Sequence, residues 1–346
     1  MSDPVTAERQ PAERILEVRG LRVAYASDGG AVVAVDRVDL VLSRGEFLGI
    51  VGESGCGKST LLYAISRLLS PPAAIIGGEV LFHGRDMVTL AEDELRNIRW
   101  RQLSVVMQSA MNALNPVLTV GAQMADACRA HSNMSSAEIT ARSREMLRLV
   151  SIDPIHLQSY PHQLSGGMRQ RAMIAMALLF TPELVIMDEP TSALDVVAQR
   201  SLMVQIKELQ EQLGFAVIFV THDMSLVGHF SDRLMVMYAG QVVELGSTRQ
   251  VFERPCHPYT GGLLEAFPSI HGPKVELLGI PGSPPDLARP PMGCRFSPRC
   301  PLAAERCGVV EPGQYDVEGD LVRCFRYENV DQPEAAAAAG APGGSP

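Results

Sequence analysis

The chain has 346 residues, 46% of them hydrophobic and 5% aromatic, and it carries a formal net charge of −9 at pH 7. This length allows two or three domains, while the acidic charge argues against a nucleic-acid-binding surface as the main functional site. The longest apolar stretches are far shorter than the roughly 20 residues that a membrane helix needs, and the N-terminus lacks the basic and apolar segments of a secretory signal.

We therefore expect a soluble, intracellular protein that can dock onto a membrane partner. In that compartment reducing conditions disfavour disulfides, so the seven cysteines are candidates for metal or cluster ligation.

Short β-type runs dominate the N-terminal part of the chain. Residues 1–13 are polar and without periodicity, which predicts a disordered lead. The runs that follow predict an antiparallel sheet at the edge of the fold. Tyr25 is their only aromatic residue, so it is either a candidate to stack on an adenine ring or an ordinary strand tyrosine. The four runs span residues 15–18, 21–25, 31–35 and 38–42.

A phosphate-binding loop is predicted at residues 52–60, between an apolar run at 47–51 and a helical run from residue 61. Its glycines let several backbone N–H groups face one anion, and the helix start adds free donors and the positive end of its dipole. Lys58 is expected to reach the β- and γ-phosphates and Ser59 to place its hydroxyl on Mg²⁺. The full G-x-x-x-x-G-K-S match predicts binding of a nucleoside triphosphate. The loop residues assigned to this binding are Gly52, Ser54, Gly55, Gly57, Lys58, Ser59 and Thr60.

An inserted helical subdomain is predicted at about residues 110–165. Before it, residues 77–86 predict a strand and hairpin, and another strand ends at Gln108. Within the insert, the runs at 120–130 and 136–150 have helical spacing with charges on one face. The sequence around residue 135 is typical of a helix N-cap.

A second candidate for phosphate binding lies at residues 164–170, ahead of a helical run at 171–180. Ser165, Gly166 and Gly167 stand where a helix N-terminus would present free N–H groups. Alone, such a sequence is usually only a helix cap. Its position between a phosphate loop and an acidic strand end favours the functional interpretation.

Two acids follow the apolar strand predicted at residues 184–189. Asp188 fits Mg²⁺ coordination, and Glu189 fits the general base that orients and deprotonates an attacking water. An exposed pair would not follow so apolar a strand.

Two further elements follow these acids. A helix is predicted from about residue 196 to 213, and a strand at 216–220 leads to His222, for which we expect a γ-phosphate contact. Residues 234–238 and 241–246 predict a hairpin.

In order and spacing, these motifs resemble those of the ATP-binding subunit of an ABC transporter over residues 14–254. The resemblance identifies Gln108 as the Q-loop residue, His222 as the switch histidine and Tyr25 as the A-loop aromatic. It identifies the longer motifs as Walker A (52–60), the signature motif (164–170), Walker B (184–189) and the D-loop (192–195).

The resemblance implies an α/β fold, that of a P-loop ABC ATPase, with a mixed sheet core, an antiparallel β subdomain and a helical subdomain. It also implies a head-to-tail dimer with a related, non-identical ATPase subunit, in which Walker A of one subunit and the signature of the other sandwich each ATP. Hydrolysis by in-line attack of water would use Glu189, His222 and Gln108, and Mg²⁺ would be held by Ser59, Gln108 and Asp188. Beyond the Walker A loop, the implied ATP contacts are Tyr25, Ser165, Gly166, Gly167, Gln170, Asp188 and Asp195.

Four cysteines stand in the Pro- and Gly-rich region after residue 246. Their spacing, Cys-x5-Cys-x6-Cys-x16-Cys, contains neither a C-x2-C pair nor a histidine partner, which weakens the zinc-finger interpretation. An iron–sulfur cluster, a Cys₄ zinc site and four unrelated buried cysteines all stay open on the residues alone. These residues are Cys294, Cys300, Cys307 and Cys324.

Residues 293–307, with 257–260 and 280–285, resemble the C-terminal region of dipeptide and oligopeptide importer ATPases, especially the D-type subunit. The resemblance implies a [4Fe-4S] cluster on the four cysteines, with Zn²⁺ as the alternative, in a small loop-rich domain at 255–331. The tail at 332–346 reads as disordered.

The resemblance further implies an ATPase that powers peptide import from the cytoplasmic face of the inner membrane. Its partners would be two membrane permease subunits, served by a periplasmic or lipid-anchored substrate-binding protein, and no nucleic acid. Gln108 and the helical insert would carry the coupling surface. There are three alternatives. The chain could serve the import of nickel chelates or oligosaccharides, it could be a soluble non-transport ABC ATPase, or it could be a redox-sensing module whose cluster gates ATP use.

Overall fold

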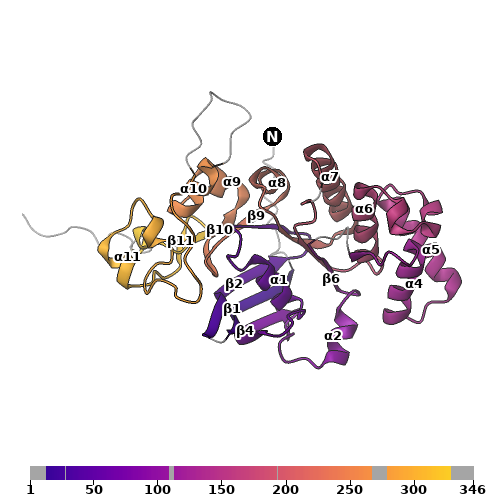
Figure 1. The fold of residues 1–346 in the computed structure, drawn as a ribbon, viewed down its shortest axis with the longest axis horizontal. Coiled ribbons are helices and arrows are strands. Elements are labelled where there is room, and N and C mark those ends of the chain that lie inside the picture. The colour runs from indigo at the N-terminus through magenta and orange to yellow at the C-terminus, as the bar shows by residue number, and fades with distance from the viewer. Residues whose placement is uncertain (1–12, 28, 109–112, 193, 267–278, 329–346) are drawn as a thin grey trace, which may run out of the picture.

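Two β-sheets and the helices around them make up the fold (Figure 1). The computed structural model describes residues 13–27, 29–108, 113–192, 194–266 and 279–328. The predicted lead and tail therefore lie almost entirely outside the described residues. Among the helices in these ranges, none has both the length and the apolarity needed to cross a membrane.

The larger sheet has eight strands in the order β11-β12-β10-β9-β3-β8-β7-β6. Five of them, from β9 to β6, pair in parallel. Their near-continuous apolar runs fit strands that are covered on both faces, and every residue of β3, β7 and β8 is buried. The carboxyl ends of these strands meet at one edge of the sheet, which is where α/β folds place their ligands. The parallel strands are β3 (Phe47–Val51), β6 (Leu103–Val106), β7 (Leu184–Asp188), β8 (Ala216–Val220) and β9 (Arg233–Tyr238).

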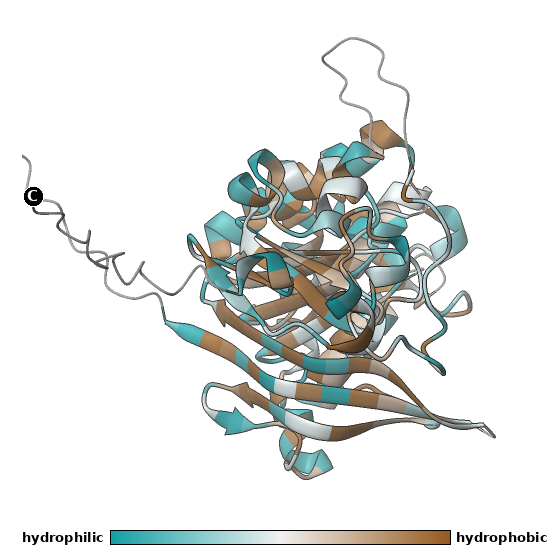
Figure 2. Cartoon of the chain, turned by 90° about the vertical axis from the view of Figure 1, so that its left-hand side faces the viewer, coloured by the Kyte–Doolittle hydropathy of each residue, from teal (hydrophilic) through white to brown (hydrophobic). Residues whose placement is uncertain are grey.

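The predicted antiparallel sheet is confirmed, with four strands in the order β2-β1-β4-β5. The four short runs of the prediction are in fact two long strands, because irregular register and a positive φ of 53° at Gly20 let one strand continue past the breaks in the pattern. Figure 2 shows hydrophobic and hydrophilic bands alternating along these strands, as expected when one face packs on the core. The strands are β1 (Arg14–Ser27), β2 (Gly30–Ser43), β4 (Ala73–Phe82) and β5 (Arg85–Asp86).

The predicted helical insert contains α4 (Val120–His131) and α5 (Ser136–Leu149). Ser135 caps α5 as predicted, because its hydroxyl accepts from the Glu138 N–H while the Glu138 carboxylate accepts from the Ser135 N–H. Other α-helices that the structure describes before residue 240 include α1 (Lys58–Ile65), α2 (Glu92–Ile98), α6 (Gly166–Ala177), α7 (Val196–Leu213) and α8 (Met224–Phe230).

The C-terminal extension, predicted at residues 255–331, is joined to the central sheet. Strand β12 (Asp320–Val322) pairs antiparallel with β10 (Gln241–Ser247), so the extension lengthens the larger sheet. It lies at the opposite end of the molecule from α4 and α5 (Figure 1). Helix α9 (Thr248–Glu253) precedes the extension, whose described residues also form α10 (Pro258–Glu265), α11 (Glu305–Val309) and β11 (Tyr315–Val317).

Candidate functional site

The glycine-rich loop runs from the end of β3 to the start of α1, as predicted. Gly52 and Gly57 have positive φ angles of 149° and 103°, and a Cβ on either would lie 2.2 Å from a backbone carbonyl oxygen. Other residues are therefore excluded there. The loop closes on Lys58, whose Nζ donates to the carbonyl oxygens of Gly52 at 2.8 Å and Glu53 at 3.0 Å. Ser54 and Gly55 lie on the loop between Glu53 and Lys58.

Ser59 and Asp188 lie together beside this loop. The Ser59 hydroxyl donates to Oδ1 of Asp188 at 3.1 Å, and the Tyr63 hydroxyl donates to Oδ2 at 3.2 Å. Burial raises the pKa of the Asp188 carboxyl, an effect that these two hydrogen bonds oppose. A hydroxyl and a carboxylate at this distance are the hard oxygen ligands that Mg²⁺ prefers, so the donor set fits that ion.

Tyr63 is a site residue that the sequence analysis missed. Burial, together with the neighbouring Asp188, raises the pKa of Tyr63 to about 12. The available signal was its position four residues after Ser59 on α1, which places both side chains on one helix face.

Glu189 is the residue around which the other predicted catalytic groups gather. The Gln108 amide donates to Oε2 of Glu189 at 2.9 Å, and Nδ1 of His222 lies 3.6 Å from Oε1. The Glu189 backbone has a positive φ of 46° and its N–H donates to the Val220 carbonyl at 2.9 Å. The ends of β6 and β8 thus bring Gln108 and His222, which are far apart in sequence, to the carboxylate that follows β7.

The signature segment lies at the N-terminus of α6, where Ser165 accepts from the Met168 N–H at 3.3 Å. Gly166 and Gly167 form the first turn, and Gln170 is buried within the helix. Within the described residues, no hydrogen bond joins this segment to the glycine-rich loop of the same chain.

Tyr25 precedes the glycine-rich loop in the sequence, and Asp195 follows Glu189. Tyr25 shares a hydrogen bond of 3.0 Å with Thr60, so it stands next to the glycine-rich loop. Asp195 caps α7 by accepting from the Ala198 N–H at 2.9 Å, while Ala193 of the D-loop lies outside the described residues.

The four extension cysteines line one cavity of about 200 Å³, together with His257 and Phe296. Burial raises the pKa of the Cys294 thiol to about 11, and also raises the pKa values of Cys300 and Cys324. In the part of the chain that the structure describes, no three His, Cys, Asp or Glu side chains are placed to hold a metal ion. The geometry therefore brings the cysteines to one cavity without supporting a bound zinc ion or cluster. The cavity cysteines are Cys294, Cys300, Cys307 and Cys324.

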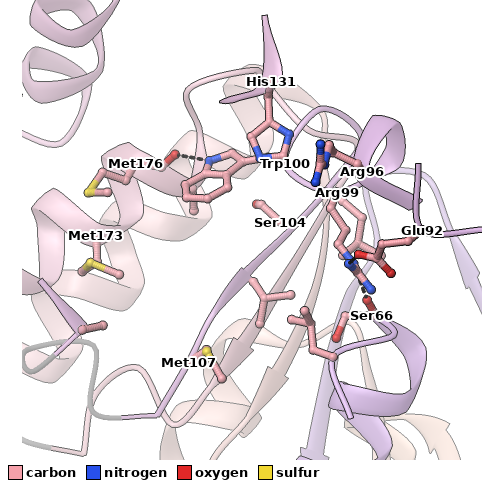
Figure 3. Close-up of a pocket in the computed structure, with 15 residues that line it drawn as sticks. Ser66, Glu92, Arg96, Arg99, Trp100, Ser104, Met107, His131, Met173 and Met176 are labelled. Atoms are coloured by element: carbon pink, nitrogen blue, oxygen red, sulfur yellow. Dashed lines mark hydrogen bonds and ion pairs between the residues drawn. The ribbon is translucent and has the colours of Figure 1, made fainter. Parts of the chain in front are cut away.

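A second cavity of about 430 Å³, also missed from the sequence, lies between α2, β6 and α6. Its lining is mostly apolar and includes Trp100, the only tryptophan of the chain. The Trp100 indole N–H donates to the Met176 carbonyl at 2.8 Å. Figure 3 shows Met173 and Met176 on one side of this cavity and Arg99 on the other.

A glycine loop closed on a lysine, a hydroxyl–carboxylate pair, and a second acid at the end of a parallel strand form a nucleotide site at the ligand-binding edge of the sheet. With the antiparallel sheet and the helical insert, they define an ATPase of the ATP-binding cassette class.

Comparison with known proteins supports this class. Residues 35–192 match the family described as ABC transporter, and residues 243–307 match the oligopeptide/dipeptide transporter C-terminal region. The dimeric post-hydrolysis structure of the ATP-binding cassette MJ0796, bound to ADP and Pi, is similar with a TM-score of 0.61 and 31% identity. The similarity covers 68% of this chain and 99% of that one.

Two curated relatives are similar over nearly the whole chain. The oligopeptide transport ATP-binding protein OppD of Salmonella typhimurium is 44% identical, covering 94% of this chain and 98% of that protein. The dipeptide transport ATP-binding protein DppD of Caldanaerobacter subterraneus subsp. tengcongensis is 42% identical, covering 91% and 97%. The chain belongs to the family of ATP-binding proteins of oligopeptide and dipeptide ABC transporters, and is an ATPase of the transporter type.

Proposed function

We propose that this chain hydrolyses ATP to power the import of oligopeptides or dipeptides. The observation that carries the proposal is the gathering of Gln108 and His222 around Glu189, next to the Ser59–Asp188 pair. The transported substrate is inferred from the names of the relatives and from the matched C-terminal region.

The chemistry is an in-line attack of water on the γ-phosphate, in which the protein positions groups and stabilises developing charge. Backbone N–H groups of residues 52–60 and the Lys58 ammonium would hold the phosphates. Glu189 would orient and deprotonate the water, while His222 would contact the γ-phosphate. Tyr25 would lie against the adenine.

Mg²⁺ would be held by Ser59, Asp188 and Gln108, and when bound it neutralises charge on the phosphates. Gln108 already contacts Glu189, so one side chain would link the ion's site to the general base.

The signature segment would serve the ATP of a second ATPase subunit. A Cβ built on Gly167 meets no atom within 4 Å, so this turn is open for a phosphate to approach. Without a hydrogen bond to its own glycine-rich loop in the described residues, the segment suits a head-to-tail dimer. In that dimer the residues offered to the partner's nucleotide are Ser165, Gly166, Gly167 and Asp195, whereas Gln170 is buried within α6.

The Trp100 cavity is the proposed docking site for a permease subunit at the cytoplasmic face of the inner membrane. Met107 lines it and precedes Gln108, while Met173 and Met176 belong to α6, whose N-cap is Ser165. A movement of Gln108 or of the signature segment on nucleotide binding would therefore be transmitted to this cavity. Apolar grooves of this kind receive amphipathic helices. Two permease subunits and a periplasmic or lipid-anchored substrate-binding protein complete the proposed importer.

The four cysteines are proposed to hold a [4Fe-4S] cluster with a structural or regulatory role. In a cubane each thiolate binds a different iron, so the four sulfurs need not converge on a single ion as they would for zinc. The observation that supports the proposal is that all four cysteines line one cavity.

Replacing Glu189 with Gln tests the assignment of the base. We expect phosphate release to fall by about a hundredfold or more, while ATP binding persists and holds the dimer closed. Glu253→Gln, which alters an exposed helix pair with Arg249, is the matched control and should hydrolyse ATP normally. Hydrolysis by Glu189→Gln at the parental rate would contradict the assignment.

Replacing Trp100 with Ala tests the docking cavity and the substrate together. Uptake of labelled peptides by cells should fall about tenfold, as expected for the loss of an aromatic anchor from an interface, while ATP hydrolysis by the purified chain is retained. Trp100→Phe, which keeps an aromatic ring in the cavity, should retain most of the uptake. Normal peptide uptake in Trp100→Ala would contradict the docking site. Deletion of the gene with loss of nickel-chelate or oligosaccharide uptake instead of peptide uptake would contradict the substrate.

Iron, sulfide and zinc content of protein purified without oxygen tests the cysteine site. We expect about four irons and four sulfides per chain with visible absorption, as for one Cys₄ cubane. In Cys300→Ser the iron, the sulfide and the absorption should all be lost. Cys128→Ser is the control, because Cys128 is buried in the helical insert away from the cavity. One zinc without colour, or no metal, would contradict the cluster.

A further inference from the structure

Arg299 of the C-terminal extension contacts the glycine-rich loop directly. Its two terminal nitrogens donate to the two carboxylate oxygens of Glu53, at 2.7 Å and 2.9 Å. Only 6% of the Arg299 side chain and 24% of the Glu53 side chain are exposed. A bidentate guanidinium–carboxylate pair that is shielded from water is among the stronger and more directional protein contacts. Glu53 therefore has a fixed orientation.

The guanidinium of Arg299 is itself held by the surrounding structure. Its Nε donates to the Pro281 carbonyl at 2.8 Å, and one terminal nitrogen donates to the Ile280 carbonyl at 3.2 Å. The other terminal nitrogen donates to the Tyr238 hydroxyl at 3.2 Å. Arg299 is thus oriented before any nucleotide arrives.

Tyr259 of α10 holds the backbone of the same loop residue. The Glu53 N–H donates to the Tyr259 hydroxyl at 3.0 Å. The Tyr259 ring is fully buried, with its centroid 4.6 Å from that of Tyr238 and 5.4 Å from that of Phe296. The extension therefore contacts both the side chain and the main chain of Glu53. The carbonyl oxygen of Glu53 is one of the two that accept a hydrogen bond from Lys58.

We propose that Arg299 is a positioning residue of the ATP site, which holds the glycine-rich loop in its phosphate-binding shape through Glu53. A loop ordered in advance loses less conformational freedom when the ligand binds, so its affinity is higher. The C-terminal extension is then part of the nucleotide site, although residue 299 is 246 positions from the residue that it holds. This inference rests on the proposed role of the loop in ATP binding.

Binding of ATP with Mg²⁺ to the full chain, measured by calorimetry, tests the inference in a double-mutant cycle. Arg299→Gln and Glu53→Gln should each weaken ATP binding about tenfold, the loss expected for charge-assisted hydrogen bonds. The double variant should bind no more weakly than either single variant, because both changes remove the same contact. In steady-state hydrolysis the KM for ATP should rise while kcat stays within about twofold.

Arg254→Gln is the matched control, since Arg254 forms an exposed pair with Glu318 at 3.0 Å, and it should bind ATP like the parent. If Arg299→Gln does not fold, Glu53→Gln breaks the pair from the loop side and carries the test. Parental affinity in Glu53→Gln, or additive losses in the double variant, would overturn the inference while leaving ATP binding intact. A parent chain that binds no ATP would instead overturn the proposed function.

Discussion

The parallel pairing of β3, β8 and β7 is the constraint on which the site depends. Because these strands end at the same edge, the glycine-rich loop, the two acids and His222 meet there although they come from distant parts of the chain. The bond from the Glu189 N–H to the Val220 carbonyl joins two of these strand ends and holds Glu189 at a positive φ that an isolated turn would disfavour. This backbone also fixes where the two carboxylates point, since Asp188 accepts a hydrogen bond from Ser59 and Glu189 accepts one from Gln108.

The extension depends on the same sheet. Its strand β12 pairs with β10, and Tyr259 of α10 and Arg299 both contact Glu53 at the start of the glycine-rich loop. Aromatic packing among Tyr238, Tyr259 and Phe296 excludes water from this junction and strengthens the Arg299–Glu53 pair. The cysteine cavity shares Phe296 with this packing. The cysteines and the nucleotide loop are therefore connected through a few buried side chains.

Local signals were sufficient to predict many elements. The bounds of α7 and β8 match the prediction because a capping aspartate, a left-handed glycine at residue 214 and a continuous apolar run mark them in the sequence. The contact of Arg299 with Glu53 could not be predicted, because no pattern in one sequence relates residues so far apart. The Trp100 cavity was missed for the same reason, since α2, β6 and α6 build it jointly. The prediction of a cysteine site located a shared cavity, but spacing alone does not fix what the cavity holds.

The central claim is that residues 52–60 bind the phosphates of ATP. Equilibrium binding of ATP with Mg²⁺ to the parent chain and to Lys58→Ala tests it most directly, with unfolding of both proteins compared in the absence of nucleotide. We expect one ATP per parent chain and binding at least about tenfold weaker in Lys58→Ala, because the variant loses a charge-assisted contact with phosphate. Equal affinity in the two proteins, or no binding by a folded parent chain, would contradict it.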